Sequence, residues 1–321
     1  MTSGLLAKKN ASPASRIVSR FRLTTFMSLV WSLIRTVLIV GICFIIIHPL
    51  LIKVTSSFMT LEDIIDSSAR WLPLQPSFVG YRLAFNLMNY PVALWNSLTL
   101  ATLVGVLQLV SCSLVGYGLA RFKFPGNSLV FGLAIFTLIV PPQMISIPLY
   151  LNFRFFNFFG LSETPINLLN TYWPFALTSM TANGFRNGLH IFIMRQFFKG
   201  MPGDLEEAAY VDGAGPFRTF FSVMLPSAIP AMVIVFLFSF VWQWNDYFLT
   251  MTFLRNSETL PIALQALPER YFASADSNDV TQYSTILNNA GSLMLMAPLI
   301  LLYAVAQRFF LESVSRTGIV G

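Results

Sequence analysis

Charged residues are scarce in this sequence. Asp, Glu, Lys and Arg together make up 11% of the 321 residues, and hydrophobic residues make up 55%, whereas soluble globular domains contain about 25% charged residues. A soluble body of this size would lack the charged side chains needed to cover its surface. Only helices and closed barrels satisfy every backbone group in hydrocarbon, and the apolar runs here are continuous rather than alternating. The composition therefore predicts an all-α polytopic membrane protein and excludes most soluble enzymes.

Residue types that build metal and catalytic centres are equally rare. The chain has two cysteines, Cys43 and Cys112, and two histidines, His48 and His190, which lie far apart in sequence. The usual metal-ligand spacings are absent, the cysteines are too few for a disulfide framework, and no nucleophile–base pair is evident. The phosphate-binding pattern Gly-x-x-x-x-Gly-Lys-Ser/Thr is also missing. We therefore expect this chain to have no enzymatic activity and no cofactor or metal of its own.

Six apolar stretches are long enough to cross a bilayer as helices, which requires about 20 residues each. Lys and Arg are most frequent in the N-terminal segment and in every second connection after it. Because basic residues are retained on the cytoplasmic side, both termini are predicted to lie in the cytoplasm. The predicted division is a basic N-terminal segment with an interfacial lead-in (1–35), a six-span domain (36–311) and a C-terminal tail (312–321), with spans at 36–56, 92–119, 129–151, 172–196, 228–250 and 288–311.

Two of the predicted spans contain residues that disturb a helix. Pro141 and Pro142 lie within the third span, and proline removes a backbone donor and clashes with the preceding turn, so we expect a kink near Pro141. In the fourth span, Arg186 lies between Gly184 and Gly188. Either the helix is locally irregular there and Arg186 faces protein or water, or the span starts later and Arg186 lies at its outer edge.

The connection between the fourth and fifth spans, residues 200–227, holds most of the clustered acidic residues. Asp204 occupies a cap position and Glu207 follows three residues later, which is the capping-box spacing. Both acids also favour the positive end of a helix dipole. Gly213 then predicts the end of this short helix in a left-handed conformation.

A second short helix is predicted directly after the first. It starts at Pro216, because proline suits the first helical position, and it must end before Pro226. The pair is expected to project from the membrane bundle at a right angle or nearly so. Leu205, Ala208 and Ala209 share one face of the first helix, and this face either fits a groove on another protein or packs on the chain's own bundle.

The same connection matches a spaced pattern. Glu207-Ala208-Ala209, Gly213, Val223 and Leu225-Pro226 reproduce, in register, Glu-Ala-Ala, three residues, Gly, nine residues, Ile, one residue and Leu-Pro, with Val223 as the one departure. In this the chain resembles the permease subunits of bacterial binding-protein-dependent ABC importers. The likeness continues from about residue 50 onward and is strongest to maltose-type, six-span permeases of the carbohydrate-uptake branch, although the tail, 312–321, departs from the family pattern. The segments that support it are 96–98, 116–126, 148–150, 160–161, 244–248 and 307–310.

This resemblance implies a mechanism. The short helix would be a coupling helix seated in a cleft of a cytoplasmic ATPase, which binds ATP and Mg. When ATP closes the ATPase dimer, the paired permeases swing from inward-facing to outward-facing, and an external solute-binding protein releases a sugar or oligosaccharide into the pathway. The implied partners are a second permease chain, two ATPase subunits, a solute-binding protein and the lipids of the bacterial cell membrane, with no nucleic acid. The residues assigned to coupling are Glu206, Glu207, Ala208, Ala209, Asp212, Gly213, Leu225 and Pro226.

Aromatic and polar residues gather in the outer half of the fifth span, where Trp242, Asn245 and Asp246 are the predicted pathway residues. Rings stack on sugar faces, and amide and carboxylate oxygens accept hydrogen bonds from hydroxyls. The cluster is equally consistent with an aromatic belt at the membrane surface and an Asn-Asp helix cap. A rival function is an ion-coupled secondary transporter in which Asp246 transfers a proton or sodium ion, but no internal repeat supports it. The sequence leaves open which sugar is moved and whether this chain touches it.

Overall fold

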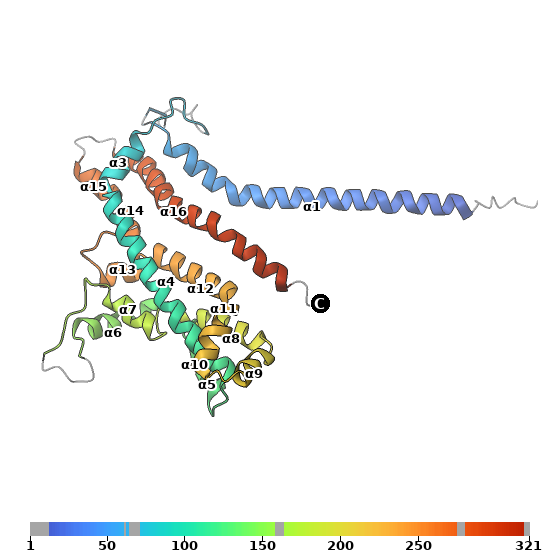
Figure 1. Ribbon diagram of the computed structural model, residues 1–321. Helices are drawn as coiled ribbons and strands as arrows, with labels where there is room; N and C mark the ends of the chain where they lie inside the picture. The colour runs from blue at the N-terminus through green and yellow to red at the C-terminus, as the bar shows by residue number, and fades with distance from the viewer. Residues whose placement is uncertain (1–12, 61, 64–70, 158–163, 275–279, 318–321) are drawn as a thin grey trace, which may run out of the picture.

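The fold is described by a computed structural model that covers residues 13–60, 62–63, 71–157, 164–274 and 280–317. Helices dominate this part of the chain, and its only β-structure is an isolated bridge between Phe156 and Ile166, so the all-α prediction is confirmed. The helices (Figure 1) are α1 (Pro13–Ser57), α3 (Val79–Leu87), α4 (Tyr90–Arg121), α5 (Asn127–Phe136), α6 (Pro142–Arg154), α7 (Trp173–Met180), α8 (Asn187–Gly200), α9 (Asp204–Val211), α10 (Pro216–Thr219), the π-helix η1 (Phe220–Met224), α11 (Leu225–Ser227), α12 (Ile229–Asn245), α13 (Phe248–Phe253), α14 (Leu260–Gln265), α15 (Leu267–Ser274) and α16 (Val280–Thr317).

Within the described residues, three helices are long and apolar enough to cross a membrane unaided. They are the Met27–Ser57 part of α1, the whole of α4, and the Tyr283–Gln307 part of α16. A fourth span exists if α12 is counted together with the bent segment Pro216–Ser227 that leads into it. The protein is therefore a multi-pass membrane protein, and its third and fourth predicted spans are interrupted rather than continuous helices.

Each of those two spans is a pair of half-length helices. In the third, α5 ends at Phe136 and α6 begins at Pro142, because Pro141 takes an extended conformation with φ −64° and ψ 135°. The kink expected near Pro141 is therefore confirmed as a full break. In the fourth, Ala182 and Arg186 have φ angles of 56° and 61°, and a left-handed residue cannot continue a right-handed helix.

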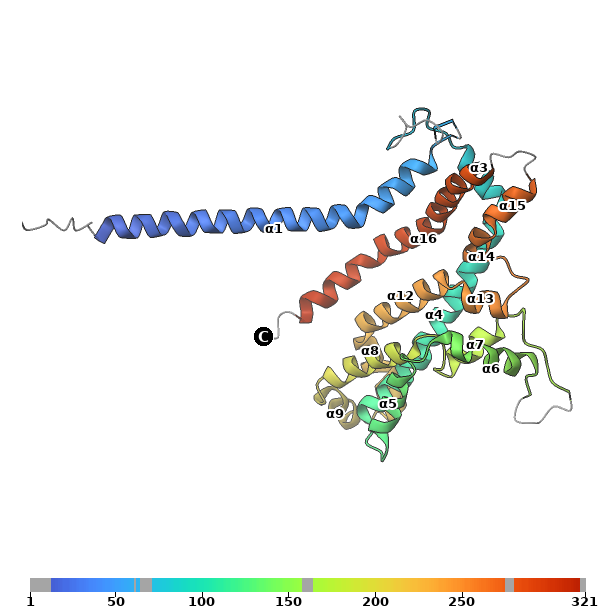
Figure 2. The ribbon, with the colours of Figure 1, turned by 180° about the vertical axis from the view of Figure 1, so that it is seen from behind.

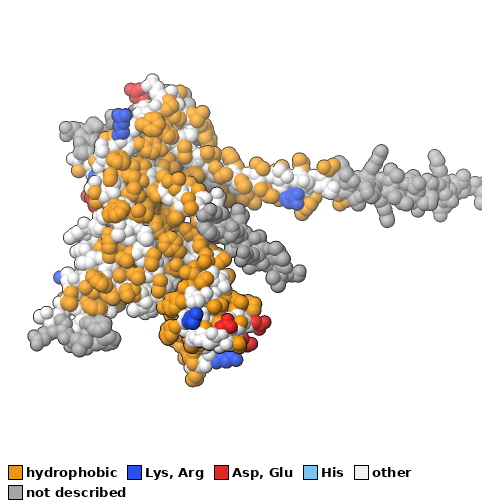
Figure 3. Space-filling view, in the orientation of Figure 1, with side chains coloured by type: hydrophobic (Ala, Val, Ile, Leu, Met, Phe, Trp, Pro, Cys, Tyr) orange, Lys and Arg blue, Asp and Glu red, His pale blue; other side chains and the backbone are white. Residues whose placement is uncertain are grey.

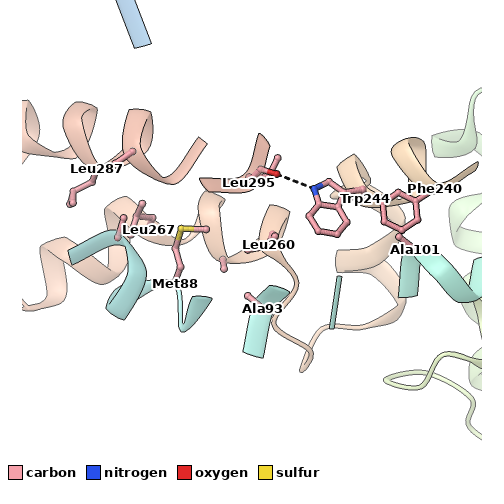
Figure 4. Packing of buried hydrophobic residues seen from close by; sticks show 12 residues of the cluster. Met88, Ala93, Ala101, Phe240, Trp244, Leu260, Leu267, Leu287 and Leu295 are labelled. Atoms are coloured by element: carbon pink, nitrogen blue, oxygen red, sulfur yellow. Dashed lines mark hydrogen bonds between the residues drawn. The ribbon is translucent and has the colours of Figure 1, made fainter. Parts of the chain in front are cut away.

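Helix α4 is the axis of the bundle, with α8 and α12 packed along it (Figures 1 and 2). Glycines permit this close approach, as small residues do between spanning helices in general. A Cβ added at Gly116 would lie 2.6 Å from the Cβ of Met194 on α8, and one at Gly105 would lie 3.0 Å from the ring of Phe236 on α12. Further along, the indole N–H of the buried Trp244 donates to the carbonyl oxygen of Leu295 at 3.2 Å, which joins α12 to α16 (Figure 4).

The two long connections between α1 and α4 and between α13 and α16 contain further short helices. These are α3, α14 and α15, which pack on α16 and α4. Two residues near the start of α4 fix this arrangement: the Asn96 amide donates to the Glu258 carbonyl oxygen at 2.8 Å, and the Ser97 hydroxyl accepts from the Leu260 N–H at 2.8 Å. Glu258 also forms an ion pair with Arg270 at 2.8 Å.

Helix α1 extends away from the bundle as a single long helix that bends where it approaches α3 (Figure 1). None of the most apolar window of Met27–Ser57 is buried within this chain, so its side chains are available to lipid or to another protein. No break separates the predicted lead-in, 24–35, from the predicted first span. At the other end, α16 runs to Thr317 and so includes part of the predicted tail, while residues 1–12 and 318–321 lie outside the described residues.

Candidate functional site

The short helix α9 starts without the predicted capping box. Gly203 is its N-cap and has helical angles of φ −64° and ψ −31°, and no side chain caps the helix. The N–H groups of Glu206 and Glu207 instead donate to the Gly203 carbonyl oxygen at 2.9 and 3.2 Å. The capping role predicted for Asp204 is therefore wrong, because the helical turn already begins at Gly203. The acids of the first turn still favour the positive end of the helix dipole.

The end of α9 follows the prediction. Gly213 has a φ of 79°, and the N–H groups of Gly213 and Ala214 donate to the carbonyl oxygens of Tyr210 and Ala209 at 3.0 and 2.9 Å. This pair of bonds is the Schellman motif, which uses a left-handed residue to satisfy the last carbonyls of a helix. The turn brings the chain to Pro216, where α10 begins as predicted.

The chain does not leave the helical path before Pro226, so that prediction is wrong. Five residues of π-helix, Phe220–Met224, follow α10, and Pro226 then lies in the first turn of α11. The change from π-helix to α-helix occurs beside this proline, whose missing N–H leaves one hydrogen bond of the helical path unmade. After α11, α12 departs at an angle of 77° to the Pro216–Ser227 segment, which agrees with the predicted near-right-angle projection.

Glu206 faces inward and fastens α9 to the bundle. Its Oε1 accepts a hydrogen bond from the Tyr117 hydroxyl at 2.9 Å and lies 3.6 Å from Nε of Arg121, both at the end of α4. Arg121 also donates to the Met201 carbonyl oxygen at 2.9 Å. The ring of Phe220 packs on Tyr117 with ring centroids 4.8 Å apart. Sequence reasoning missed this contact, although Tyr117 and Arg121 both lie in the 116–126 segment that supports the family resemblance.

The outer surface of this segment is the part available to a partner. The predicted face divides, since Leu205 and Ala208 are exposed whereas Ala209 is buried. Two large apolar side chains are also left in the open, Val211 at 87% and Phe217 at 80% exposure. Exposed apolar side chains ringed by polar ones mark interaction sites, and charges surround this end of the molecule in Figure 3. Of the other predicted coupling residues, Glu207, Asp212, Gly213 and Pro226 are exposed and Leu225 is half-buried.

The predicted pathway residue Trp242 is packed among other side chains. Its ring stacks with those of His190 and Phe238 at centroid distances of 5.3 and 5.5 Å. The guanidinium group of Arg186 lies 4.5 Å from the same ring system. Sequence reasoning did not connect Trp242 with Arg186, because the two residues lie on different helices and more than fifty positions apart.

Asn245 and Asp246 make local hydrogen bonds. The Asn245 amide donates to the Val241 carbonyl oxygen of its own helix at 2.8 Å. The Asp246 carboxylate accepts from the N–H groups of Leu249 and Thr250, at 3.3 and 2.8 Å, and from the Thr250 hydroxyl at 2.8 Å. Asp246 therefore caps the start of α13, which is the helix-cap alternative raised by the sequence.

Polar groups also collect inside the bundle beside the break between α7 and α8. Gln108 on α4 and Asn187 and His190 on α8 are buried. Several of their atoms have no hydrogen-bond partner among the described residues: Gln108 Oε1, both side-chain polar atoms of Asn187, and His190 Nε2. In the sequence, Gln108 within the predicted apolar span 92–119 was the residue that could have indicated this polar cluster.

Comparison with known proteins places this sequence in a family. Residues 112–312 match the sequence profile of a family described as binding-protein-dependent transport system inner membrane component. The chain is 32% identical over 272 residues to the diacetylchitobiose uptake system permease protein NgcG of Streptomyces coelicolor, covering 85% of this chain and 83% of that protein. It is 28% identical over 277 residues to the trehalose transport system permease protein SugB of Mycobacterium tuberculosis, covering 86% and 90% of the two chains.

The fold itself is also found in a solved structure. A chain from the crystal structure of a bacterial ABC transporter involved in the import of the acidic polysaccharide alginate superposes with a TM-score of 0.68 at 23% sequence identity. The match covers 94% of the present chain and 100% of that chain.

Proposed function

Since this chain belongs to the family of binding-protein-dependent transport system inner membrane components, we propose that it forms half of the membrane pathway of an ATP-driven importer for a sugar or oligosaccharide. Its role is that of a transport permease subunit. The sugar class is supported by its similarity to permeases named for diacetylchitobiose and trehalose.

Membership of this family implies a solute-binding protein and an ATPase as partners. In the proposed complex, two permease chains, of which this is one, associate with two ATPase subunits that bind ATP and Mg. Both termini and α9 lie on the cytoplasmic side, in keeping with the higher frequency of Lys and Arg in the N-terminal segment and in every second connection after it. The solute-binding protein approaches from the opposite side.

The observation that best supports this proposal is the contact between α9 and α4. The outer face of α9 is open to a partner, whereas Glu206 on its inner face is held by Tyr117 and Arg121. A displacement of α9 by an ATPase would therefore be passed to α4. Since α4 packs along both α8 and α12, the three helices would move together and change the access to the pathway.

Reversing the charge of Glu207 tests the proposal. Glu207 is exposed and belongs to the pattern shared with importer permeases, whereas Asp204 is also exposed, lies in the same first turn and is outside the pattern. Both Glu207→Lys and Asp204→Lys lose similar helix-dipole stabilisation, so they form a matched pair.

The full importer would be reconstituted in vesicles, and ATP-dependent uptake and ATP hydrolysis stimulated by the loaded binding protein would be measured. We expect Glu207→Lys to lower both by about tenfold or more, the effect of losing roughly 1.4 kcal/mol at an interface. Asp204→Lys should stay within about twofold of the unmodified protein. Normal uptake by Glu207→Lys would contradict the proposed coupling surface.

A further inference from the structure

The depth of Arg186 in the membrane follows from its neighbours. The carbonyl oxygen of Phe185, the preceding residue, accepts a hydrogen bond from the Gln108 amide at 3.3 Å. Gln108 lies near the middle of the 32-residue helix α4, about 20 Å from its Arg121 end at 1.5 Å per residue. Because the hydrocarbon core is about 30 Å thick, Arg186 lies within it. Of the two sequence-based interpretations, the geometry therefore favours the irregular helix over the outer-edge position.

Arg186 is held at this depth by an unusual backbone and by aromatic rings. It is the N-cap of α8 and has left-handed angles of φ 61° and ψ 18°. Its guanidinium group lies 5.1 Å from the ring of Phe185 and 4.5 Å from that of Trp242. These cation–π contacts hold a guanidinium group that carries five N–H donors.

No carboxylate in the described part of the chain neutralises Arg186. The two ion pairs found there are Arg121–Glu206 and Arg270–Glu258, and the Arg186 side chain is exposed. A charged group at this depth is costly unless it faces a water-filled cavity or a partner. The adjoining Asn187, which is buried with both side-chain polar atoms unpaired, adds a further group that needs water or a ligand at the same level.

We propose that Arg186 is a solute-contacting residue of the translocation pathway, whose guanidinium group donates hydrogen bonds to the hydroxyl or carboxylate oxygens of a passing saccharide. This inference rests on the proposed importer function and adds a residue to it. Trp242 supports the guanidinium group as a positioning residue, because its ring already packs against Arg186, His190 and Phe238. A fixed positive charge at this point also disfavours cationic solutes.

Water access to position 186 tests the proposal without knowledge of the solute. Arg186→Cys would be made in the full importer after Cys43 and Cys112 are replaced by alanine, with Val110→Cys as the control. Val110 lies two residues from Gln108 on α4 and is therefore at a depth similar to that of Arg186. Its side chain is 54% exposed. The probe is the membrane-impermeant thiol reagent 2-sulfonatoethyl methanethiosulfonate. It is applied to two states of the importer, one without nucleotide and one with ATP trapped on its ATPase subunits.

We expect the cysteine at 186 to react in at least one of the two states and the cysteine at 110 to react at least about tenfold more slowly, because charged reagents do not partition into hydrocarbon. Equal reaction rates at both positions, or no reaction at 186 in either state, would overturn the proposal. A failure of the importer function itself is recognised separately, since the loaded binding protein would then not stimulate ATP hydrolysis by the unmodified complex.

Transport coupled to hydrolysis gives a second readout. With diacetylchitobiose as the probe, Arg186→Gln is expected to lower the amount of sugar imported per ATP hydrolysed by about tenfold, which corresponds to roughly 1.4 kcal/mol. Arg186→Lys retains the charge but lacks the planar guanidinium group, so its sugar import per ATP should lie between that of Arg186→Gln and that of the unmodified protein. If Arg186→Gln instead prevented the two permease chains from assembling, Arg186 would pair with the companion chain, and the solute contact would be wrong.

Discussion

At the scale of single residues, backbone conformation and hydrogen-bond partners decide what the motif residues do. Gly213 is required for its left-handed angle, with φ 79°, and not for space, since nothing lies within 4 Å of a Cβ built there. Glu206 holds α9 to α4 through a hydrogen bond from Tyr117 and an ion pair with Arg121. Its neighbour Glu207 is exposed, so two adjacent glutamates have different surroundings, one bonded to α4 and one on the open face of α9.

Substituting alanine at Gly213 and at Gly215 separates conformation from contact. Both glycines are in open space, but Gly215 has a φ of −76°, which any residue adopts. We expect Gly213→Ala to destabilise the end of α9 by about 1–2 kcal/mol, so that backbone amides in α9 exchange hydrogen roughly 5–30 times faster. Gly215→Ala should leave these hydrogen-exchange rates unchanged. Mass spectrometry measures the exchange in both variants. Equal exchange rates in the two variants would show that the left-handed turn is not limiting.

At the scale of helices, close packing of α4 against α8 determines the geometry. Gly116 is buried where the two helices cross, and a Cβ at this position would lie 2.6 Å from the Cβ of Met194 and 3.0 Å from the backbone nitrogen of Arg195. Two residues later, Gly118 has only the ring of Phe122 nearby, at 3.9 Å. Both glycines belong to one segment of the sequence, but only one of them lies in the contact.

Valine at each of these glycines is therefore expected to have unequal effects. Gly116→Val should force α4 and α8 apart and destabilise the protein by about 1–3 kcal/mol, as overpacking does. Gly118→Val should be close to neutral. Thermal unfolding of the purified protein in detergent, followed by the loss of its monodisperse chromatographic peak, measures the difference. A midpoint for Gly118→Val as low as that for Gly116→Val would argue against this contact.

At the scale of the whole molecule, the proposed source of energy is a separate ATPase. The ion-coupled alternative requires a carboxylate free to exchange a proton or sodium ion, but the Asp246 carboxylate accepts three hydrogen bonds at the start of α13. No comparison favours this alternative, whereas the family match points to an external ATPase. The long exposed helix α1 and the open face of α9 are likewise surfaces suited to a multi-chain assembly.

Uptake by the reconstituted importer is therefore expected to require ATP on the side of the vesicle membrane that α9 faces. It is also expected to persist when ionophores collapse the proton and sodium gradients. Asp246→Asn replaces one acceptor oxygen with an amide, which should destabilise α13 by about 1–3 kcal/mol without making uptake sensitive to ionophores. The matched measurement is the initial uptake rate of each variant with and without ionophore. A rate that fell with the gradients in the unmodified complex would revive the ion-coupled mechanism.

Features that depend on neighbours in sequence could be predicted from the sequence alone. Low charge and continuous apolar runs determined an all-α membrane protein, Pro141 and Pro142 determined a break, and Gly213 determined the end of α9. These follow because helix formation, proline geometry and a glycine turn involve residues only a few positions apart. The spaced pattern from Glu207 to Pro226 identified the family for the same reason.

Only the tertiary structure decided which side chains face inward and how deep the polar groups lie. Tyr117 and Glu206 are 89 residues apart, and Gln108 and Phe185 are 77 apart. Which helices lie side by side determines these contacts, and no local pattern encodes it. The inward turn of Glu206, the burial of Ala209 and the depth of Arg186 therefore depended on the packing of α4 against α8 and of α9 against η1 and α10.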